Sequence, residues 1–419
     1  MNKSDVDVLI IGGGPAGLSA AVELRKQGVK KVLLVEREQE LGGIPRHCHH
    51  TGFGWFDLRR VLSGPAYAKY RTDLFKKSGA EYMTETSALS WSAQNSVKLT
   101  GPQGLCEISA SAVLLATGCR ERPRAARLIP GMRPSGIHTT GSLQQQVYLN
   151  GKTIGKKAVV VGAEHVSFSA VHTLISSGTK VVALVDQFPK HQSYSAFKFL
   201  TATLHRVPMF PSCRITNILG RDRLEAIEIT DATTGTSTMI ECDTLVFTGD
   251  WIPANELIRL GDIALDKGTH GPQIDLQLRT SREGVFAAGN LLHGAEIADV
   301  AGLEGRAVAL PILNYLNSRQ GSKNWRKTSE LSISLKEPIQ WISPNVVTES
   351  SQKIPSAVKH FHFRVKDFNR NLRVIVRQGN TVLHAQRFTQ TKPNFPYKLS
   401  ATWTEKIIEG GPRIEISAD

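Results

Sequence analysis

A glycine pattern near the start of the chain constrains its fold more than any other feature. The pattern Gly12-x-Gly14-x-x-Gly17 stands between an apolar run at residues 6–11 and a segment with helical apolar spacing at residues 15–27. In a strand–turn–helix unit, the first glycine permits the tight turn, the second lets the backbone approach a pyrophosphate, and the third allows close helix–strand packing. The helix N-terminus then faces the phosphates. The pattern therefore predicts a nucleotide-binding βαβ unit.

An acidic residue at the end of the next apolar run supports this prediction. Residues 31–35 read as a second strand, and Glu36 follows it directly, 24 positions after Gly12. A carboxylate at this place can accept hydrogen bonds from a ribose. Glu36 is therefore the predicted ribose ligand.

The same order of elements recurs later in the chain, with one discrepancy. A strand at 158–161, a helix at 164–177 and a strand at 180–185 are predicted, and Asp186 again follows 24 positions after Gly162. Where the pattern needs its second glycine, the chain has Glu164, whose charge opposes a pyrophosphate. Gly162, Glu164 and Asp186 are the candidate residues for NAD(P) or another adenine nucleotide, and a fold kept only for packing is the alternative.

Length and composition predict several domains. The 419 residues exceed what one hydrophobic core usually organises. We predict an α/β chain with a discontinuous first nucleotide domain (1–125 and 270–325), an inserted second one (126–269) and a small β-rich C-terminal domain (335–419). A polar, linker-like stretch at 317–338 precedes the last of these.

Charge and the lack of long apolar runs exclude some function classes. The net charge is +14, but the basic residues are dispersed rather than gathered with aromatics, so no nucleic-acid partner is expected. No run approaches the roughly 18 to 20 apolar residues of a membrane span, and no signal-peptide pattern follows the start. We expect a cytoplasmic protein.

The five cysteines are scattered and form no C-x-x-C pair. That spacing argues against a disulfide framework, a redox dithiol and a cluster held by this chain alone. Cys48 stands among His47, His49 and His50, but we expect no metal there, because metal sites need ligands that converge. Cys48 is the one candidate redox thiol, and the catalytic residues are otherwise unassigned.

Several further segments resemble known flavoproteins. Gly42-Gly43 after Glu36, Ala116-Thr117-Gly118 after a buried strand, and the segment 280–290 are similar to FAD-binding glutathione-reductase-like oxidoreductases. That resemblance implies two Rossmann-like domains, one inserted in the other, with Asn290 where the class usually has Asp. It assigns FAD to Gly12, Gly14, Pro15, Ala16, Gly17, Glu36, Arg37, Gly42, Gly43, Arg46, Ala116, Thr117, Gly118, Gly289 and Asn290.

At a finer level, residues 5–318 resemble the FAD/NAD-fold subunits of multi-subunit dehydrogenases such as hydrogen cyanide synthase, opine oxidase and the proline and sarcosine complexes. The resemblance implies an electron-relaying subunit beside a DAO-like flavoprotein subunit that oxidises a small amine or amino acid. Some relatives carry a cysteine-rich cluster segment, but no cysteine follows Cys242 here, so a [2Fe-2S] cluster would need a separate small protein. A stand-alone NAD(P)H-dependent flavin reductase and a non-catalytic assembly subunit are the alternatives.

Overall fold

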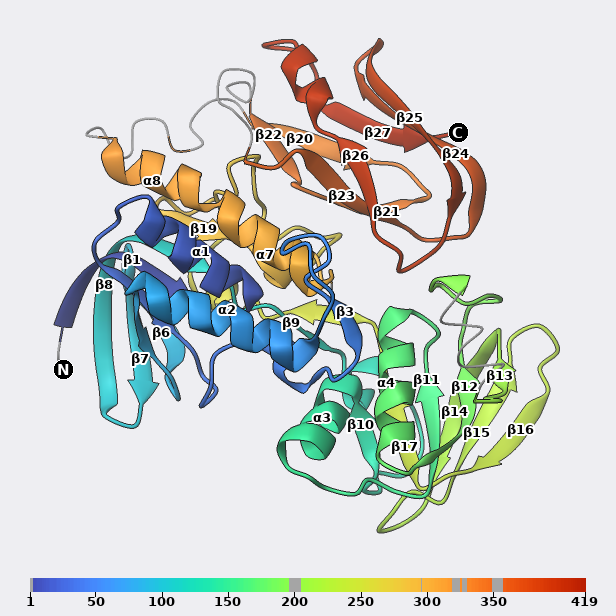
Figure 1. The fold of residues 1–419 in the computed structure, drawn as a ribbon. Coiled ribbons are helices and arrows are strands. Elements are labelled where there is room, and N and C mark those ends of the chain that lie inside the picture. The colour runs from blue at the N-terminus through green and yellow to red at the C-terminus, as the bar shows by residue number, and fades with distance from the viewer. Residues whose placement is uncertain (1–2, 196–204, 295, 319–324, 326–329, 349–356) are drawn as a thin grey trace. The chain divides into compact units, whose positions relative to one another are not determined.

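The computed structural model describes residues 3–195, 205–294, 296–318, 325, 330–348 and 357–419. Part of the predicted linker, 319–324 and 326–329, lies outside the described residues, as do 196–204 of the predicted second domain. The chain forms two compact units (Figure 1), the first from Met1–Arg46, Thr51–Cys119 and Pro253–Asp419, the second from His47–His50 and Arg120–Ile252. The predicted three-domain division stays a prediction beside these units.

A mixed sheet organises the first unit. Its order is β5-β2-β1-β8-β7-β6, and β19 pairs with β8. The strands are β1 (Lys3–Ile11), β2 (Val32–Val35), β5 (Glu81–Met83), β6 (Ser87–Ala93), β7 (Ser96–Gly101), β8 (Gly104–Leu115) and β19 (Val285–Ala287). The five strands β5, β2, β1, β8 and β19 run parallel, and β6–β8 form an antiparallel meander, which the short alternating segments at about 80–108 predict. All four residues of β2 are buried, as in a parallel sheet covered on both faces.

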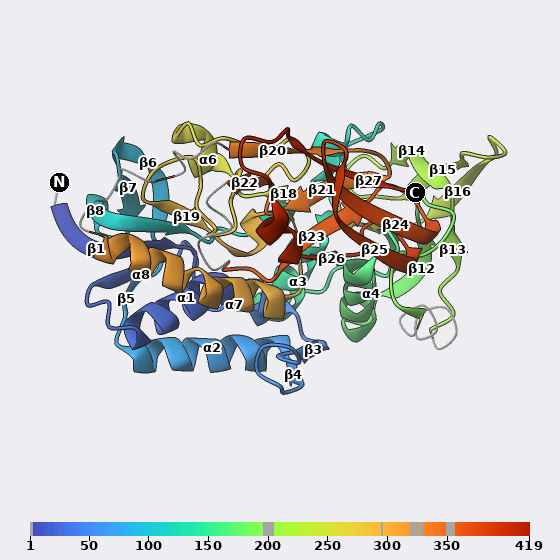
Figure 2. The ribbon, with the colours of Figure 1, turned by 90° about the horizontal axis from the view of Figure 1, so that it is seen from above.

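Helices cover one face of this sheet (Figures 1 and 2). They are α1 (Pro15–Lys26), α2 (Gly64–Ser78), α7 (Ala298–Ala307) and α8 (Ala309–Asn317); the short α6 (Glu256–Leu260), the 3-10 turns η1 (Ile44–His47) and η5 (Gly289–Leu291), and the hairpin β3 (Thr51–Phe53) and β4 (Leu62–Ser63) complete the connections. The apolar spacing of residues 298–316 predicts a single amphipathic helix, and the structure divides it at Val308. Pro311 supplies the reason, because its ring displaces the carbonyl four residues earlier.

The C-terminal module of the first unit consists of two sheets, β22-β20-β27-β24-β25 and β21-β23-β26. The strands are β20 (Glu330–Leu335), β21 (Ile339–Ser343), β22 (Val346–Thr348), β23 (His360–Val365), β24 (Asn369–Gln378), β25 (Thr381–Thr391), β26 (Tyr397–Ser400) and β27 (Ile414–Ala418), with the turn η7 (Thr402–Lys406). Both sheets contribute to one apolar core, in which Trp403 stacks on Phe361 at 5.0 Å between ring centroids. The predicted β-rich character of this region is therefore observed.

The second unit has its own parallel sheet, β10-β17-β11-β12-β13, and an antiparallel sheet, β14-β15-β16. The elements are β10 (Ile137–Thr139), β11 (Lys157–Val161), β12 (Lys180–Val185), β13 (Met209–Phe210), β14 (Cys213–Leu219), β15 (Ala226–Asp231), β16 (Ser237–Glu241), β17 (Thr244–Phe247), α3 (Thr140–Gln144), α4 (His165–Ser176), the 3-10 turn η2 (Arg124–Arg127) and the π-helical η3 (Gln145–Leu149). The chain crosses between the units through β9 (Cys119–Glu121) and β18 (Trp251–Pro253). Within the described residues, no helix is long and apolar enough to span a membrane.

Candidate functional site

The first glycine turn leaves an open space at the start of α1. Gly12 has a φ of +114°, and a Cβ on it would overlap the carbonyl oxygen of Ala116. A Cβ on Gly14 would meet only the Cα of Gly43, at 4.0 Å. Gly14 is also the N-cap of α1, and no side chain caps the helix there. The first N–H groups of α1 are therefore available to a bound anion.

The segments predicted to hold FAD meet around this helix end. A Cβ on Gly43 would lie 2.8 Å from the Cα of Gly14, and the N–H of Gly42 donates to the carbonyl of Gly13 at 2.8 Å. A Cβ on Gly289 would lie 2.8 Å from the Cβ of Ala16. Separate stretches of sequence thus approach one turn so closely that a side chain at Gly43 or Gly289 would collide with it.

Glu36 holds this turn from the end of β2. The N–H of Gly13 donates to its Oε2 at 2.7 Å, and the N–H of Glu38 donates to its Oε1 at 2.9 Å. The residue is 8% exposed. A carboxylate accepts more than two hydrogen bonds, so Glu36 keeps the capacity to accept from ribose hydroxyls.

The two arginines assigned to FAD are occupied by nearby acids. Arg46 lies 3.3 Å from the Glu40 carboxylate, and its side chain is 15% exposed. Arg37 lies 3.7 Å from Glu38, and its side chain is 73% exposed. Arg46 packs beside Gly42, where its side chain would contact a Cβ on that residue.

Beyond the arginines, two polar side chains assigned to FAD also bond to the chain. Thr117 Oγ1 donates to the carbonyl of Ala254 at 2.8 Å. The amide of Asn290 pairs twice with the backbone of Glu296, donating at 3.1 Å and accepting at 3.0 Å. Asn290 therefore shapes the turn that precedes α7.

The second glycine turn differs from the first because its helix is capped by its own chain. Glu164 is the N-cap of α4, and its carboxylate accepts from the N–H groups of Val166 and Ser167. Ser167 Oγ donates to Glu164 Oε1 at 3.0 Å and accepts from the Glu164 N–H at 3.2 Å. This is a capping box, and it uses the donors that would bind a pyrophosphate. The spacing Glu164-x-x-Ser167 was the signal for it in the sequence.

Asp186, the candidate ribose ligand of the second fold, is likewise held internally. Its Oδ2 accepts from Gln192 Nε2, and its Oδ1 accepts from the Phe188 N–H at 3.4 Å. Burial raises the pKa of its carboxyl to about 6, although the hydrogen bond from Gln192 opposes that shift. Nothing in the sequence pattern marked Gln192 as its partner.

Cys48 belongs to the second unit and is buried. Its Sγ lies 3.2 Å from Gln144 Oε1, and the neighbouring His49 ring stacks on Tyr148 at 3.8 Å. Burial, together with the charge of Glu121, raises the pKa of the thiol to about 12. Since the thiolate is the reactive form, this environment disfavours nucleophilic or redox chemistry at Cys48.

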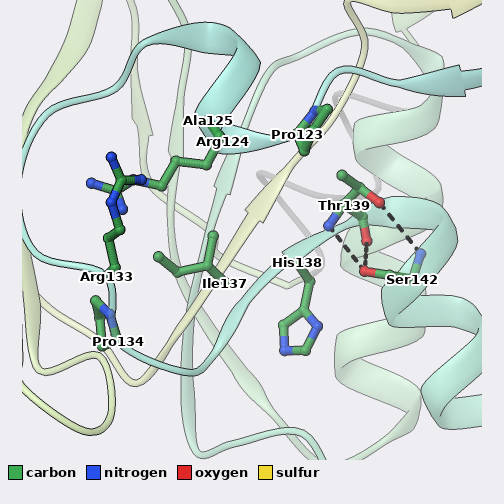
Figure 3. Close-up of a pocket in the computed structure, with 9 residues that line it drawn as sticks. All are labelled: Pro123, Arg124, Ala125, Arg133, Pro134, Ile137, His138, Thr139 and Ser142. Atoms are coloured by element: carbon green, nitrogen blue, oxygen red, sulfur yellow. Dashed lines mark hydrogen bonds between the residues drawn. The ribbon is translucent and has the colours of Figure 1, made fainter.

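The second unit also contains a cavity of about 430 Å³ beside η2 (Figure 3). Arg124 and Arg133 lie on one side of it, and His138 lies near the start of α3. Arg124 donates to the carbonyls of Pro130 and Gly131, at 3.0 and 2.9 Å. This arginine therefore fixes the wall of the cavity with part of its guanidinium.

Known proteins are similar to this chain in sequence and in fold. The chain is 25% identical over 341 residues to an opine oxidase subunit of Rhizobium meliloti, in an alignment that covers 73% of this chain and 62% of that protein. Thioredoxin reductase of T. acidophilum superposes with a TM-score of 0.63 at 22% identity, over 74% of this chain and 98% of the reductase. L-proline dehydrogenase of P. horikoshii superposes with a TM-score of 0.56 at 21% identity, over 75% of this chain and 56% of the dehydrogenase.

These likenesses confirm the predicted fold and the predicted resemblance. The model of the family described as pyridine nucleotide-disulphide oxidoreductase matches residues 6–305, which include both nucleotide folds. Oxidoreductases that bind FAD and NAD(P) make up this family, so the predicted enzyme class and the predicted FAD cofactor are confirmed at that level. The chain belongs to the pyridine nucleotide-disulphide oxidoreductase family.

Proposed function

We propose that this chain is an FAD-dependent subunit that relays electrons within a multi-subunit amine or amino-acid dehydrogenase. The observation that carries the proposal is the contrast between its two glycine turns. The start of α1 is open to a phosphate, whereas the start of α4 is capped by Glu164. One nucleotide site is thus built for a ligand, and the other is satisfied by the chain.

The residues of the first fold fit FAD. The turn from Gly12 to Gly17 would hold the pyrophosphate with backbone N–H groups, and Glu36 would accept from the adenosine ribose. Gly43 and Gly289 let their segments pack directly against the first glycine turn, at Gly14 and Ala16. When bound, the isoalloxazine supplies the redox chemistry, and the protein supplies position and electrostatics.

The second fold is a poor site for NAD(P)H. A pyrophosphate at the start of α4 would have to displace or face the Glu164 carboxylate. Two unit charges 4 Å apart at an effective dielectric of 20 repel by about 4 kcal/mol. The electrons would therefore come from another donor, which a partner subunit can supply. A relative named as one subunit of an opine oxidase supports that source.

The proposed partners follow from the same reasoning. A DAO-like flavoprotein subunit would oxidise the small amine or amino acid and pass the electrons to this chain. All five cysteines lie within the described segments, none of them is in a disulfide, and no cysteine follows Cys242. If a [2Fe-2S] cluster takes part, it would then sit on a separate small protein.

One observation favours a second candidate, a stand-alone NAD(P)H-dependent reductase. Asp186 follows β12 directly, at the position where a ribose ligand is expected, and its side chain is a carboxylate. Rearrangement of Gln192 and Glu164 would be needed before a nicotinamide nucleotide could use it.

An anaerobic titration separates the two candidates. The purified yellow protein is mixed with NADH and then NADPH while the oxidised-flavin absorbance band is followed, and dithionite is added last. The proposal expects no bleaching by either nucleotide and full bleaching by dithionite. Prompt bleaching by NADH or NADPH would replace the proposal with the reductase, and a colourless protein that takes up no FAD would favour an assembly subunit.

A further inference from the structure

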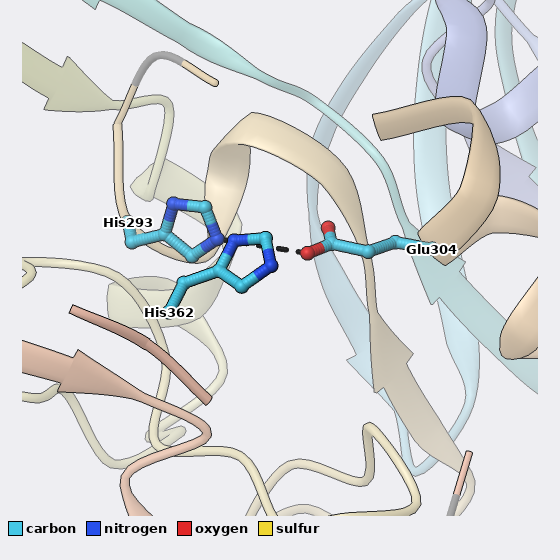
Figure 4. Close-up of side chains that lie close together, drawn as sticks. All are labelled: His293, Glu304 and His362. Atoms are coloured by element: carbon cyan, nitrogen blue, oxygen red, sulfur yellow. Dashed lines mark ion pairs between the residues drawn. The ribbon is translucent and has the colours of Figure 1, made fainter. Parts of the chain in front are cut away.

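Three side chains from separate segments converge where the C-terminal module meets the first nucleotide fold, inside the first unit (Figure 4). His293 follows η5, Glu304 lies in α7 and His362 lies in β23. Their ligand-type atoms all lie within 4.8 Å of one another, and His293 Nε2 is 3.6 Å from Glu304 Oε1. Both imidazole rings point toward the Glu304 carboxylate in Figure 4.

Each of the three side chains is oriented by its surroundings. Glu304 Oε2 accepts from the N–H of Gly289 at 2.9 Å, which leaves Oε1 directed at the imidazoles. The His293 ring stacks on Trp341 at 5.2 Å between centroids. In β23, Phe361 and Phe363 enter the module core, so strand alternation turns His362 to the opposite face.

The cluster is short of hydrogen bonds. The Nδ1 atoms of His293 and His362 are buried without a hydrogen-bond partner, and so is Oε1 of the nearby Glu296. The 3.6 Å between His293 and Glu304 is too long for a good hydrogen bond. The unpaired Nδ1 of His293 is not the atom that faces Glu304, so the case for a bound ion rests on the gap between His293 Nε2 and Glu304 Oε1.

The spacing across that gap fits a metal ion. With bonds of about 2.0–2.1 Å in tetrahedral geometry, two zinc ligands lie roughly 3.4 Å apart. The separation between His293 Nε2 and Glu304 Oε1 is 3.6 Å, and small movements would bring in the remaining atom. We propose that His293, Glu304 and His362 bind a divalent transition-metal ion, Zn²⁺ in the first instance.

The chemistry of the three side chains is compatible with that ion. Imidazole nitrogens and carboxylate oxygens are both ligands that Zn²⁺ accepts. The charge of Glu296 acts on His293, so its carboxylate is a candidate for a fourth ligand.

The consequence is structural. The ion would join β23 of the C-terminal module to Glu304, which in turn holds the backbone of Gly289. Gly289 packs against Ala16 at the start of α1. The metal would thus fasten the module to the segment that closes the proposed FAD site, and this inference stands apart from how that flavin is reduced.

The test measures zinc and FAD separately on the full chain. The protein is stripped with a chelator and dialysed against micromolar ZnSO₄, and zinc per chain is read by elemental analysis while flavin per chain is read by absorbance. Wild type should hold one zinc. H362Q and E304Q should bind zinc at least about 100-fold more weakly. H360Q, an exposed histidine on the same face of β23, is the matched control and should hold one zinc.

A wild type that binds no zinc, or an H362Q variant that keeps it, would overturn the proposal. If the variants lose FAD or fail to fold, X-ray absorption at the zinc edge of wild type decides instead. Two imidazole ligands and a carboxylate are expected there, and an all-water or sulfur environment would overturn the site. Loss of zinc with FAD retained leaves the proposed function untouched, so the two failures are distinguishable.

Discussion

The two glycine turns have the same topology, one between β1 and α1 and the other between β11 and α4. They differ in the group that faces the N-terminus of the following helix. Both turns begin with a glycine at positive φ, Gly12 at +114° and Gly162 at +127°. In the first, Gly14 caps α1 with backbone alone; in the second, Glu164 places a carboxylate on the first N–H groups of α4. A helix N-terminus favours an anion, and a side chain can supply it as well as a ligand can. One residue type at the cap therefore separates an available phosphate site from a closed one.

The acids that follow the second strands show the same contrast. Glu36 accepts from the backbone N–H of Gly13 and so shapes the glycine turn. Asp186 is paired with the side chain of Gln192, and burial raises its pKa to about 6. The first carboxylate holds the first glycine turn, whereas the second is bonded within its own fold.

Placing a glutamate at the N-cap of α1 should give the largest effect, because it makes the first turn resemble the second. In G14E the new Cβ has open space and an ordinary φ of −81°, so the fold should tolerate it, while the carboxylate would occupy the start of α1. We expect FAD affinity to fall about 1000-fold, equivalent to ~4 kcal/mol. Titration of apoprotein with FAD, followed by flavin fluorescence, measures it. G14A is the uncharged control and should lose less, and a G14E protein as yellow as wild type would refute the assignment.

Removing the charge of Asp186 should change the free energy of unfolding in a way that depends on pH. A carboxyl whose folded pKa is raised contributes stability that is present below its unfolded pKa near 3.8 and is lost as pH rises through about 6. D186N should therefore be more stable than wild type above pH 7, by up to ~3 kcal/mol, with no gain below pH 4. Urea unfolding across this pH range measures the difference.

Asp243 provides a control of opposite sign for that experiment. Desolvation opposes its ionisation, but the N–H groups of Lys156 and Lys157 donate to it and lower its pKa. D243N should therefore be less stable than wild type at neutral pH. A D186N difference that does not change with pH would contradict a buried, ionisable Asp186.

Opening the second turn should have the smallest effect. E164G removes the carboxylate at a cost of only about 0.3 kcal/mol in helix capping, because glycine is itself a tolerated N-cap. We expect NADH affinity to rise about tenfold over wild type, with E164Q between the two because it keeps an acceptor without the charge. NADH fluorescence titration measures this. Equal affinity in all three proteins would show that Glu164 does not close the site.

The sequence predicted features that depend on neighbours along the chain. Gly12, Gly14 and Gly17 lie within six residues, and the two βαβ units follow from apolar spacing, so strand and helix positions agree closely with the structure. The break between α7 and α8 was missed, although Pro311 marked it. A proline leaves the helical spacing of apolar residues unchanged, but it removes a backbone hydrogen bond of the helix.

Features that depend on contacts between residues far apart in the chain could not be predicted from the sequence. His293, Glu304 and His362 come from a loop, a helix and a strand of another sheet, and only the packing of the module brings them together. Cys48 looked reactive among three histidines, but burial raises the pKa of its thiol. Asn290 was expected at the flavin, and its amide instead pairs with the backbone of the turn before α7. Its assignment to FAD stays a prediction.

We infer that the first nucleotide fold binds FAD and that Glu164 blocks the corresponding site of the second fold. A count of nucleotides tests this difference without any variant: the purified protein is incubated with FAD, NADH and ADP, rapidly desalted and denatured, and the released nucleotides are separated and quantified. We predict one FAD per chain and no second nucleotide. Two nucleotides per chain, or a nicotinamide nucleotide without FAD, would contradict the inference.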